Sequence, residues 1–121
     1  MKVNLLVLLR AALYLTFSLG IGRLLNILPG RGLWEAHLLL GIVIAVLAVF
    51  ALRPRAGLPR DGLRLTARFF PLLPLAIGLA LWLDWLTGPA PTLVHVALGI
   101  ATIGLIEAVA ARERRSISTP A

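Results

Sequence analysis

The chain has 121 residues, of which 60% are hydrophobic, and a formal net charge of +7 with no cysteine. A soluble domain of this length leaves much of its surface in water, so this composition and a mean hydropathy of +0.96 exclude an ordinary soluble fold. The lack of cysteine excludes disulfides, iron–sulfur clusters, covalent c-type haem and thiolate metal sites.

Long apolar runs predict an all-α integral membrane four-helix bundle that occupies residues 1–121 as a single domain. We expect transmembrane helices near residues 11–28, 33–52, 69–86 and 92–111. Pro29 and Gly30 end the first run, and Pro54 follows the second. Pro71 and Pro74 are expected in the first turn of the third helix, where proline is tolerated. The N-terminal run is interpreted as a retained helix rather than a cleaved signal peptide.

The basic residues predict which side of the membrane each end of the chain occupies. One side carries ten of the twelve basic residues: Lys2, Arg10, Arg53, Arg55, Arg60, Arg64, Arg68, Arg112, Arg114 and Arg115. The opposite side has only Arg23 and Arg31. The positive-inside rule therefore places both termini and the middle loop in the cytoplasm. Basic residues at helix ends indicate topology, and no nucleic-acid partner is expected.

The chain also shows an internal repeat when it is shifted along itself by 58 residues. The shift superposes scarce residue types on one another: Arg10 on Arg68, Gly20 on Gly78, Gly30 on Gly88, His37 on His95 and Gly41 on Gly99. Residues 1–58 and 59–116 would then be two tandem parallel helical hairpins, related by a pseudo-two-fold axis along the membrane normal.

His37 and His95 are the only histidines, and the repeat equates them. Both lie at nearly the same depth, about 24 Å of helix from Arg53 and about 25 Å from Arg112 respectively, at 1.5 Å per residue. Two neutral imidazoles that face each other in a bundle suit a six-coordinate haem iron. Gly41 and Gly99 follow four residues later on the same helix face, where they leave space for a flat macrocycle.

Other interpretations of these residues stay open. The histidines can be structural interhelical contacts, and the two glycines can serve helix packing. A zinc site would need Glu35 or Asp84 as a third ligand. Arg23 and Arg31 are candidate partners of haem propionates, although Arg23 can instead extend to the surface or pair with a carboxylate. Glu107 is expected to pair with the C-terminal arginines.

The segment from His37 through Gly41 to Arg53 and Arg55 resembles the cytochrome b561-like superfamily of membrane b-type cytochromes. The segment from His95 through Gly99 to Arg112 repeats the pattern. Two-haem members have four ligand histidines at two levels, whereas this chain has two at one level and would hold a single haem. The layout is also similar to one half of haem A synthase, but that family has Glu-x-x-His where this chain has Glu35-Ala-His37.

The resemblance and the histidines together predict an electron-transfer protein. It would hold one bis-histidine haem b near the outer face, with quinone as a second candidate cofactor. Other membrane redox subunits or an extracytoplasmic electron carrier would be its partners, and the plasma membrane of a prokaryote its location. Whether it is an enzyme in its own right is left open. The alternative is a haem-free accessory or assembly subunit; a transporter is disfavoured because no polar residues lie near the bilayer midplane.

Overall fold

The computed structural model describes residues 4–28, 30–58 and 60–118. Within these ranges the ordered elements are all helices. They are α1 (Leu5–Leu24), α2 (Arg31–Ala51), α3 (Gly62–Phe69), α4 (Leu72–Trp82) and α5 (Pro89–Ser118). Four helical spans are long and apolar enough to cross a membrane, with α3 and α4 forming one of them, Gly62–Trp82. The chain therefore has the fold of a multi-pass membrane protein.

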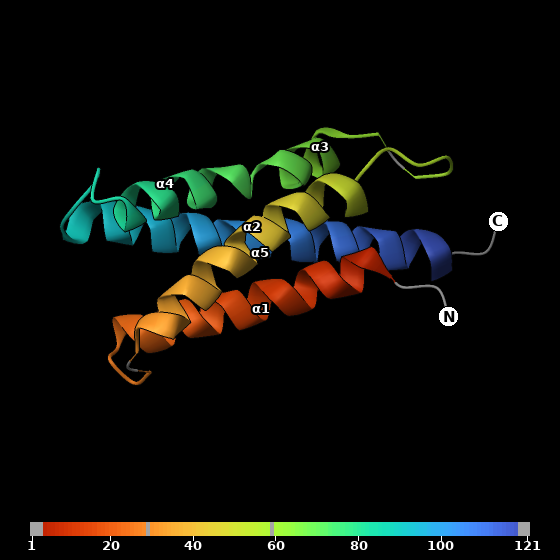
Figure 1. Cartoon of the computed structure of the whole chain (residues 1–121). Helices are drawn as coiled ribbons and strands as arrows, with labels where there is room; N and C mark the ends of the chain where they lie inside the picture. Colours follow the sequence, from red (N-terminus) through yellow and green to blue (C-terminus); the bar gives the residue numbers. More distant parts are fainter. Residues whose placement is uncertain (1–3, 29, 59, 119–121) are drawn as a thin grey trace.

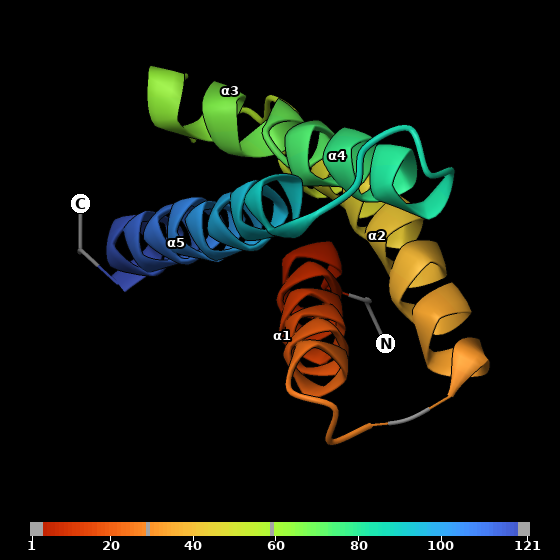
Figure 2. The ribbon, with the colours of Figure 1, turned by 90° about the vertical axis from the view of Figure 1, so that its left-hand side faces the viewer.

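The helices form a bundle with its chain ends together (Figure 1). The two termini and the α2–α3 loop lie at one end, which we call the terminal end, and the α1–α2 and α4–α5 loops lie at the other, the loop end. Helix α1 packs mainly on α2, and α4 packs on α5. The turned view in Figure 2 shows α3 and α4 on the side of the bundle opposite α1, with α2 and α5 between them.

The tightly packed core lies toward the terminal end. It consists of Leu9, Leu13, Ile44, Ala48, Ala51, Leu52, Ala67, Ile106 and Val109, all nearly inaccessible. Alanines at Ala48 and Ala67 let the helix backbones approach closely, as small residues do in membrane bundles. Because these contacts close the bundle at the terminal end, the free space is left in its other half.

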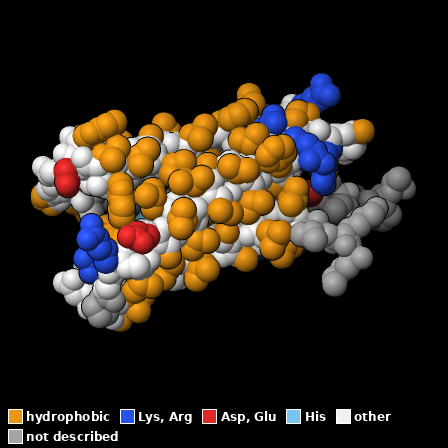
Figure 3. All heavy atoms as spheres, viewed as in Figure 1, with side chains coloured by type: hydrophobic (Ala, Val, Ile, Leu, Met, Phe, Trp, Pro, Cys, Tyr) orange, Lys and Arg blue, Asp and Glu red, His pale blue; other side chains and the backbone are white. Residues whose placement is uncertain are grey.

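Charges are confined to the two ends of the visible face, and apolar side chains cover its middle (Figure 3).

The last carbonyls of α2 would lack partners at the helix end. Arg64, which is buried, supplies a partner for one of them: its Nη2 donates to the carbonyl of Ala51, and also to that of Arg53 just beyond the helix. This arginine thereby ties α3 to the end of α2.

Helix boundaries differ from those expected in three places. Helix α1 begins at Leu5 rather than near residue 11, because the side chain of Asn4 caps the amides of Leu6 and Val7. Arg10 therefore lies inside α1, and it pairs with Glu107, which was expected to pair with the C-terminal arginines. Helix α2 is within two residues of its expected range. Lys2 and Pro29 lie outside the described residues.

The third and fourth spans also differ. Asp61 caps α3 through the amide of Arg64, so the third span begins well before residue 69. The third span, Gly62–Trp82, begins well before Pro71 and Pro74, so the expectation that these prolines lie in its first turn is wrong. Pro71 separates α3 from α4 in mid-span, because proline lacks the amide donor and clashes with the preceding turn. Helix α5 runs on to Ser118, since arginine and glutamate are good helix formers.

Candidate functional site

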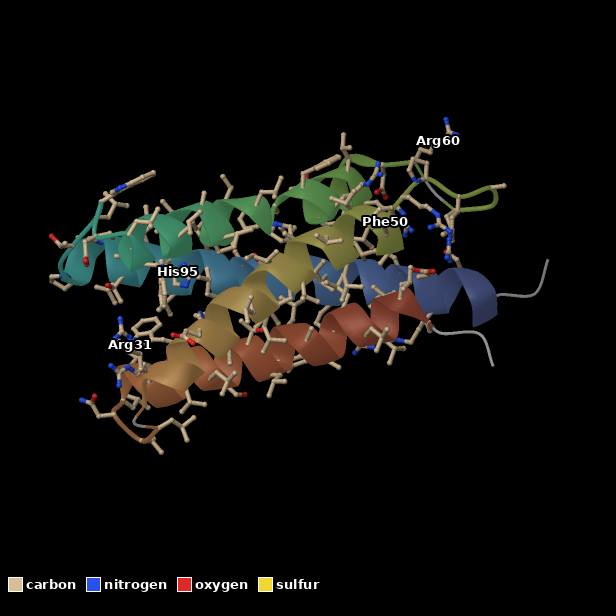
Figure 4. The ribbon with its side chains drawn as sticks, in the orientation of Figure 1. Arg31, Phe50, Arg60 and His95 are labelled. Atoms are coloured by element: carbon tan, nitrogen blue, oxygen red, sulfur yellow. The ribbon has the colours of Figure 1, made fainter. Side chains whose placement is uncertain are left out.

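A cavity of about 660 Å³ lies among α1, α2, α4 and α5. Ligand sites in proteins usually enclose a few hundred to about 1,000 Å³ and have mostly apolar walls. Leucine, isoleucine, proline and glycine residues make up most of this wall, and both histidines are part of it. Figure 4 labels His95 on α5 in the half of the bundle away from the termini. The cavity is large enough for a cofactor rather than for a water molecule alone.

The two imidazoles face each other across the bundle. The centroids of the His37 and His95 rings are 6.0 Å apart, and the ring planes are inclined at 74°. His37 comes from α2 and His95 from α5. The structure thus brings together the two histidines that the sequence analysis identified, which lie 58 positions apart in the chain.

Each imidazole is also hydrogen-bonded to the helix beside it. His37 Nδ1 lies 2.8 Å from the carbonyl oxygen of Thr16 on α1, and His95 Nδ1 lies 2.8 Å from that of Pro74 on α4. A carbonyl only accepts hydrogen bonds, so in a neutral ring Nδ1 carries the proton and Nε2 keeps its lone pair. Both rings are therefore held in the tautomer in which the lone pair of Nε2 is free to bind a metal or to accept a hydrogen bond.

Local geometry recurs at positions separated by 58 residues. The two histidine hydrogen bonds are one such pair, since Thr16 and Pro74 are themselves 58 apart. The left-handed residues Asn26 and Asp84, with φ of 55° and 58°, are another. Both follow a helix end at which Ile27 and Trp85 donate backbone bonds to Gly22 and Ala80.

Four glycines border the site in two different ways. Gly41 and Gly99 line the cavity, and a Cβ built at Gly99 meets nothing within 4 Å, so this wall faces open space. Gly20 and Gly78 instead press against the histidines: a Cβ there would lie 2.8 Å and 2.7 Å from Cε1 of His37 and His95. Sequence reasoning matched these two glycines in the repeat but did not connect them to the imidazoles.

The two candidate arginines differ in position. Arg23 lines the cavity, and its guanidinium carbon lies 5.5 Å from the centroid of the Trp34 ring, which lines the cavity as well. This is the distance of a cation–π contact, which holds the charge at the cavity mouth. Arg31 is exposed at the start of α2 (Figure 4) and is not among the residues that line the cavity.

Carboxylates do not complete a metal site around the histidines. In the described part of the chain, no three His, Cys, Asp or Glu side chains are grouped closely enough to hold a metal ion. Asp84 lines the cavity, whereas Glu35 is exposed on α2 and does not. Zinc sites usually have three or four protein ligands, so the arrangement does not suit zinc.

The fold and the site define a class: a small helical protein with four helical spans able to cross a membrane and two neighbouring imidazoles in a partly open cavity among them. In comparisons with known proteins, no family model matches the chain, and neither a curated protein nor a solved structure matches it. Any functional conclusion therefore depends on the geometry of the site.

Proposed function

We propose that this protein is a membrane b-type cytochrome that holds one haem between His37 and His95. The separation of the two imidazoles is the observation that carries the proposal. Two imidazoles that bind one metal in line have ring centres roughly 6 Å apart, because each nitrogen–metal bond is about 2 Å and each ring adds about 1.1 Å. The ring centroids are 6.0 Å apart.

The surroundings of the rings fit the same group. The carbonyls of Thr16 and Pro74 orient the imidazoles and make them better donors, as outer partners of metal-bound histidines do. The apolar cavity has room for a macrocycle, and its wall is open at Gly99, whereas a Cβ at Gly41 would contact Leu75. Arg23 supplies a positive charge at the cavity for a propionate.

The chemistry that follows is electron transfer. Bound haem supplies a one-electron ferric/ferrous couple. His37 and His95 would both hold the haem iron, so the site would leave no place at the metal for a substrate, and the protein itself need not be an enzyme. The helices hold both rings by backbone hydrogen bonds, and most of the residues around them are apolar. Electrons would pass to other membrane redox subunits, an extracytoplasmic carrier or quinone.

We further propose that the two halves are parallel repeats in the plasma membrane of a prokaryote, with both termini cytoplasmic. The hydrogen bonds and left-handed residues that recur at a spacing of 58 support the repeat. The concentration of arginine at the terminal end supports the orientation. The haem would then lie in the outer half of the membrane, so one haem by itself would not carry electrons across.

The deciding experiment is a reduced-minus-oxidised absorption spectrum of the full chain, purified from haem-replete cells and after titration with haemin. We expect sharp low-spin b-type bands and one haem per chain. A protein that stays colourless and takes up no haemin at equimolar concentration contradicts the proposal. It would favour the alternative, a haem-free accessory or assembly subunit of a membrane complex.

The two arginines offer a test of how a haem would be oriented. Arg23→Gln is expected to weaken haem binding by about 10–150-fold, since a hydrogen bond to a charged group contributes about 1.5–3 kcal/mol. Arg31→Gln removes the same charge outside the cavity and is expected to leave the dissociation constant unchanged. Haemin titration followed by absorbance measures both. Equal effects of the two variants would contradict a propionate role for Arg23.

The orientation of the chain in the membrane is testable by cysteine labelling, because the natural chain has no cysteine. Ala56 in the α2–α3 loop and Ala90 at the start of α5 are both exposed, and they lie at opposite ends of the bundle. In intact cells, a membrane-impermeant maleimide should label Ala90→Cys but not Ala56→Cys. After the membrane is permeabilised, both should react. The reverse pattern would overturn the cytoplasmic placement of the termini.

A further inference from the structure

Both imidazoles rest on a helix that carries a glycine at the point of contact. The hydrogen-bond acceptor on α1 is the carbonyl of Thr16, four residues before Gly20. The acceptor on α4 is the carbonyl of Pro74, four residues before Gly78. A helical side chain points toward the N-terminus and covers the turn that precedes its own Cα. A side chain at position 20 or 78 would therefore cover the carbonyl that the imidazole uses.

We propose that Gly20 and Gly78 are positioning residues: the missing side chain exposes the carbonyl four residues earlier and so fixes the tautomer of the facing histidine. The acceptor residues differ between the two halves, because only their backbone oxygen is used. The glycines are the same. A Cβ at either position would approach Cε1 of the ring within 3 Å, a distance that forces the imidazole to move.

Each glycine affects only the imidazole that it contacts, so the two rings would change independently. An imidazole displaced from the carbonyl loses the acceptor that keeps its proton on Nδ1. The lone pair is then no longer fixed on Nε2, where a metal would bind. This inference deepens the proposed function, because it explains how two histidines are prepared as axial ligands. Its first test, however, is made on protein without haem, so the two ideas can fail separately.

The test uses the fact that the chain has only two histidines. Protein labelled with ¹⁵N in the imidazole rings is studied by NMR in lipid nanodiscs without haem. In the natural chain we expect both rings as the single Nδ1–H tautomer. Gly20→Ala should abolish this signature for His37 and leave His95 unchanged, and Gly78→Ala should do the reverse. The untouched histidine is thus an internal control in each variant.

Gly104→Ala is the matched control, because this glycine also lies within a helix and a Cβ there meets nothing within 4 Å. It should leave both rings unchanged. Retention of the Nδ1–H signature in Gly20→Ala and Gly78→Ala, or mixed tautomers in the natural chain, would overturn the inference. With haemin, each of these two variants should bind 10–100-fold more weakly, the usual loss when a partner of a metal-bound histidine is removed.

A variant that fails to fold still decides the question. If Gly20→Ala does not accumulate because its methyl group collides with the ring, removal of the ring should restore it. We therefore expect Gly20→Ala combined with His37→Ala to be as helical and monodisperse as His37→Ala alone. If the combined variant also fails to fold, Gly20 serves general helix packing and the inference is wrong. Uptake of haemin by the natural chain tests the proposed function separately.

Discussion

Replacement of either His37 or His95 by alanine is expected to abolish the six-coordinate low-spin haem of the loaded protein. The ring centroids are 6.0 Å apart, so each imidazole would occupy one side of the proposed metal position. One remaining axial ligand gives a five-coordinate, high-spin centre. The affinity should fall by more than the roughly 100-fold that loss of an outer partner causes. Absorption and electron paramagnetic resonance spectra distinguish the two spin states.

Chemical rescue separates lost ligation from lost folding. Free imidazole should enter the space that the missing ring leaves in either variant and restore the low-spin spectrum. His37→Ala combined with His95→Ala should bind no haem in stoichiometric amount while it keeps its helical circular dichroism. A variant that retains the low-spin bands without added imidazole would show that the missing histidine is not a ligand.

The second large effect is expected for the ion pair between α1 and α5. Arg10 donates to both carboxylate oxygens of Glu107, at 2.6 Å and 2.9 Å, and about a third of each side chain is exposed. Glu107→Gln leaves the guanidinium without a counter-charge inside a membrane span. We expect the free energy of unfolding to fall by about 2 kcal/mol, between the roughly 0–1 of an exposed pair and the 3–5 of a buried one. Unfolding by denaturing detergent in mixed micelles measures it.

A double-mutant cycle shows whether the loss belongs to the pair. Arg10→Leu and Glu107→Leu should each destabilise the protein, whereas both together should cost less than their sum, because no unpaired charge remains. Arg112→Gln is the comparison, since its pair with Asp61 is more exposed. That variant should lose at most about 1 kcal/mol. Additive effects in the cycle would mean that the ion pair does not stabilise the bundle.

Much of the fold follows from short stretches of sequence read alone. Each span is apolar over about the length that crosses a bilayer, so the four helices were predictable, and α2 was placed within two residues. Boundaries were less accurate where one side chain decides them. Asn4 and Asp61 each start a helix earlier than hydropathy indicates, because their side-chain oxygens satisfy free backbone amides.

The candidate site was predictable in part. Two lone histidines at matched positions marked their helices, and the structure places both rings in one cavity. Arg23 also lines this cavity, whereas Arg31 does not. The pairing of Arg10 with Glu107, 97 positions away, was missed, because nothing in the local sequence around either residue points to the other.

By itself, the sequence determined that this chain forms four apolar helical spans and which two positions carry imidazoles. Hydropathy, helix-breaking residues and scarce residue types are properties of the chain at each point, so no neighbour is needed to read them. Only the tertiary structure decided that the imidazoles face each other at 6.0 Å and that Gly20 and Gly78 lie against them. Distances between helices depend on how each helix is rotated and crossed against the next, which the packing of all four spans settles together.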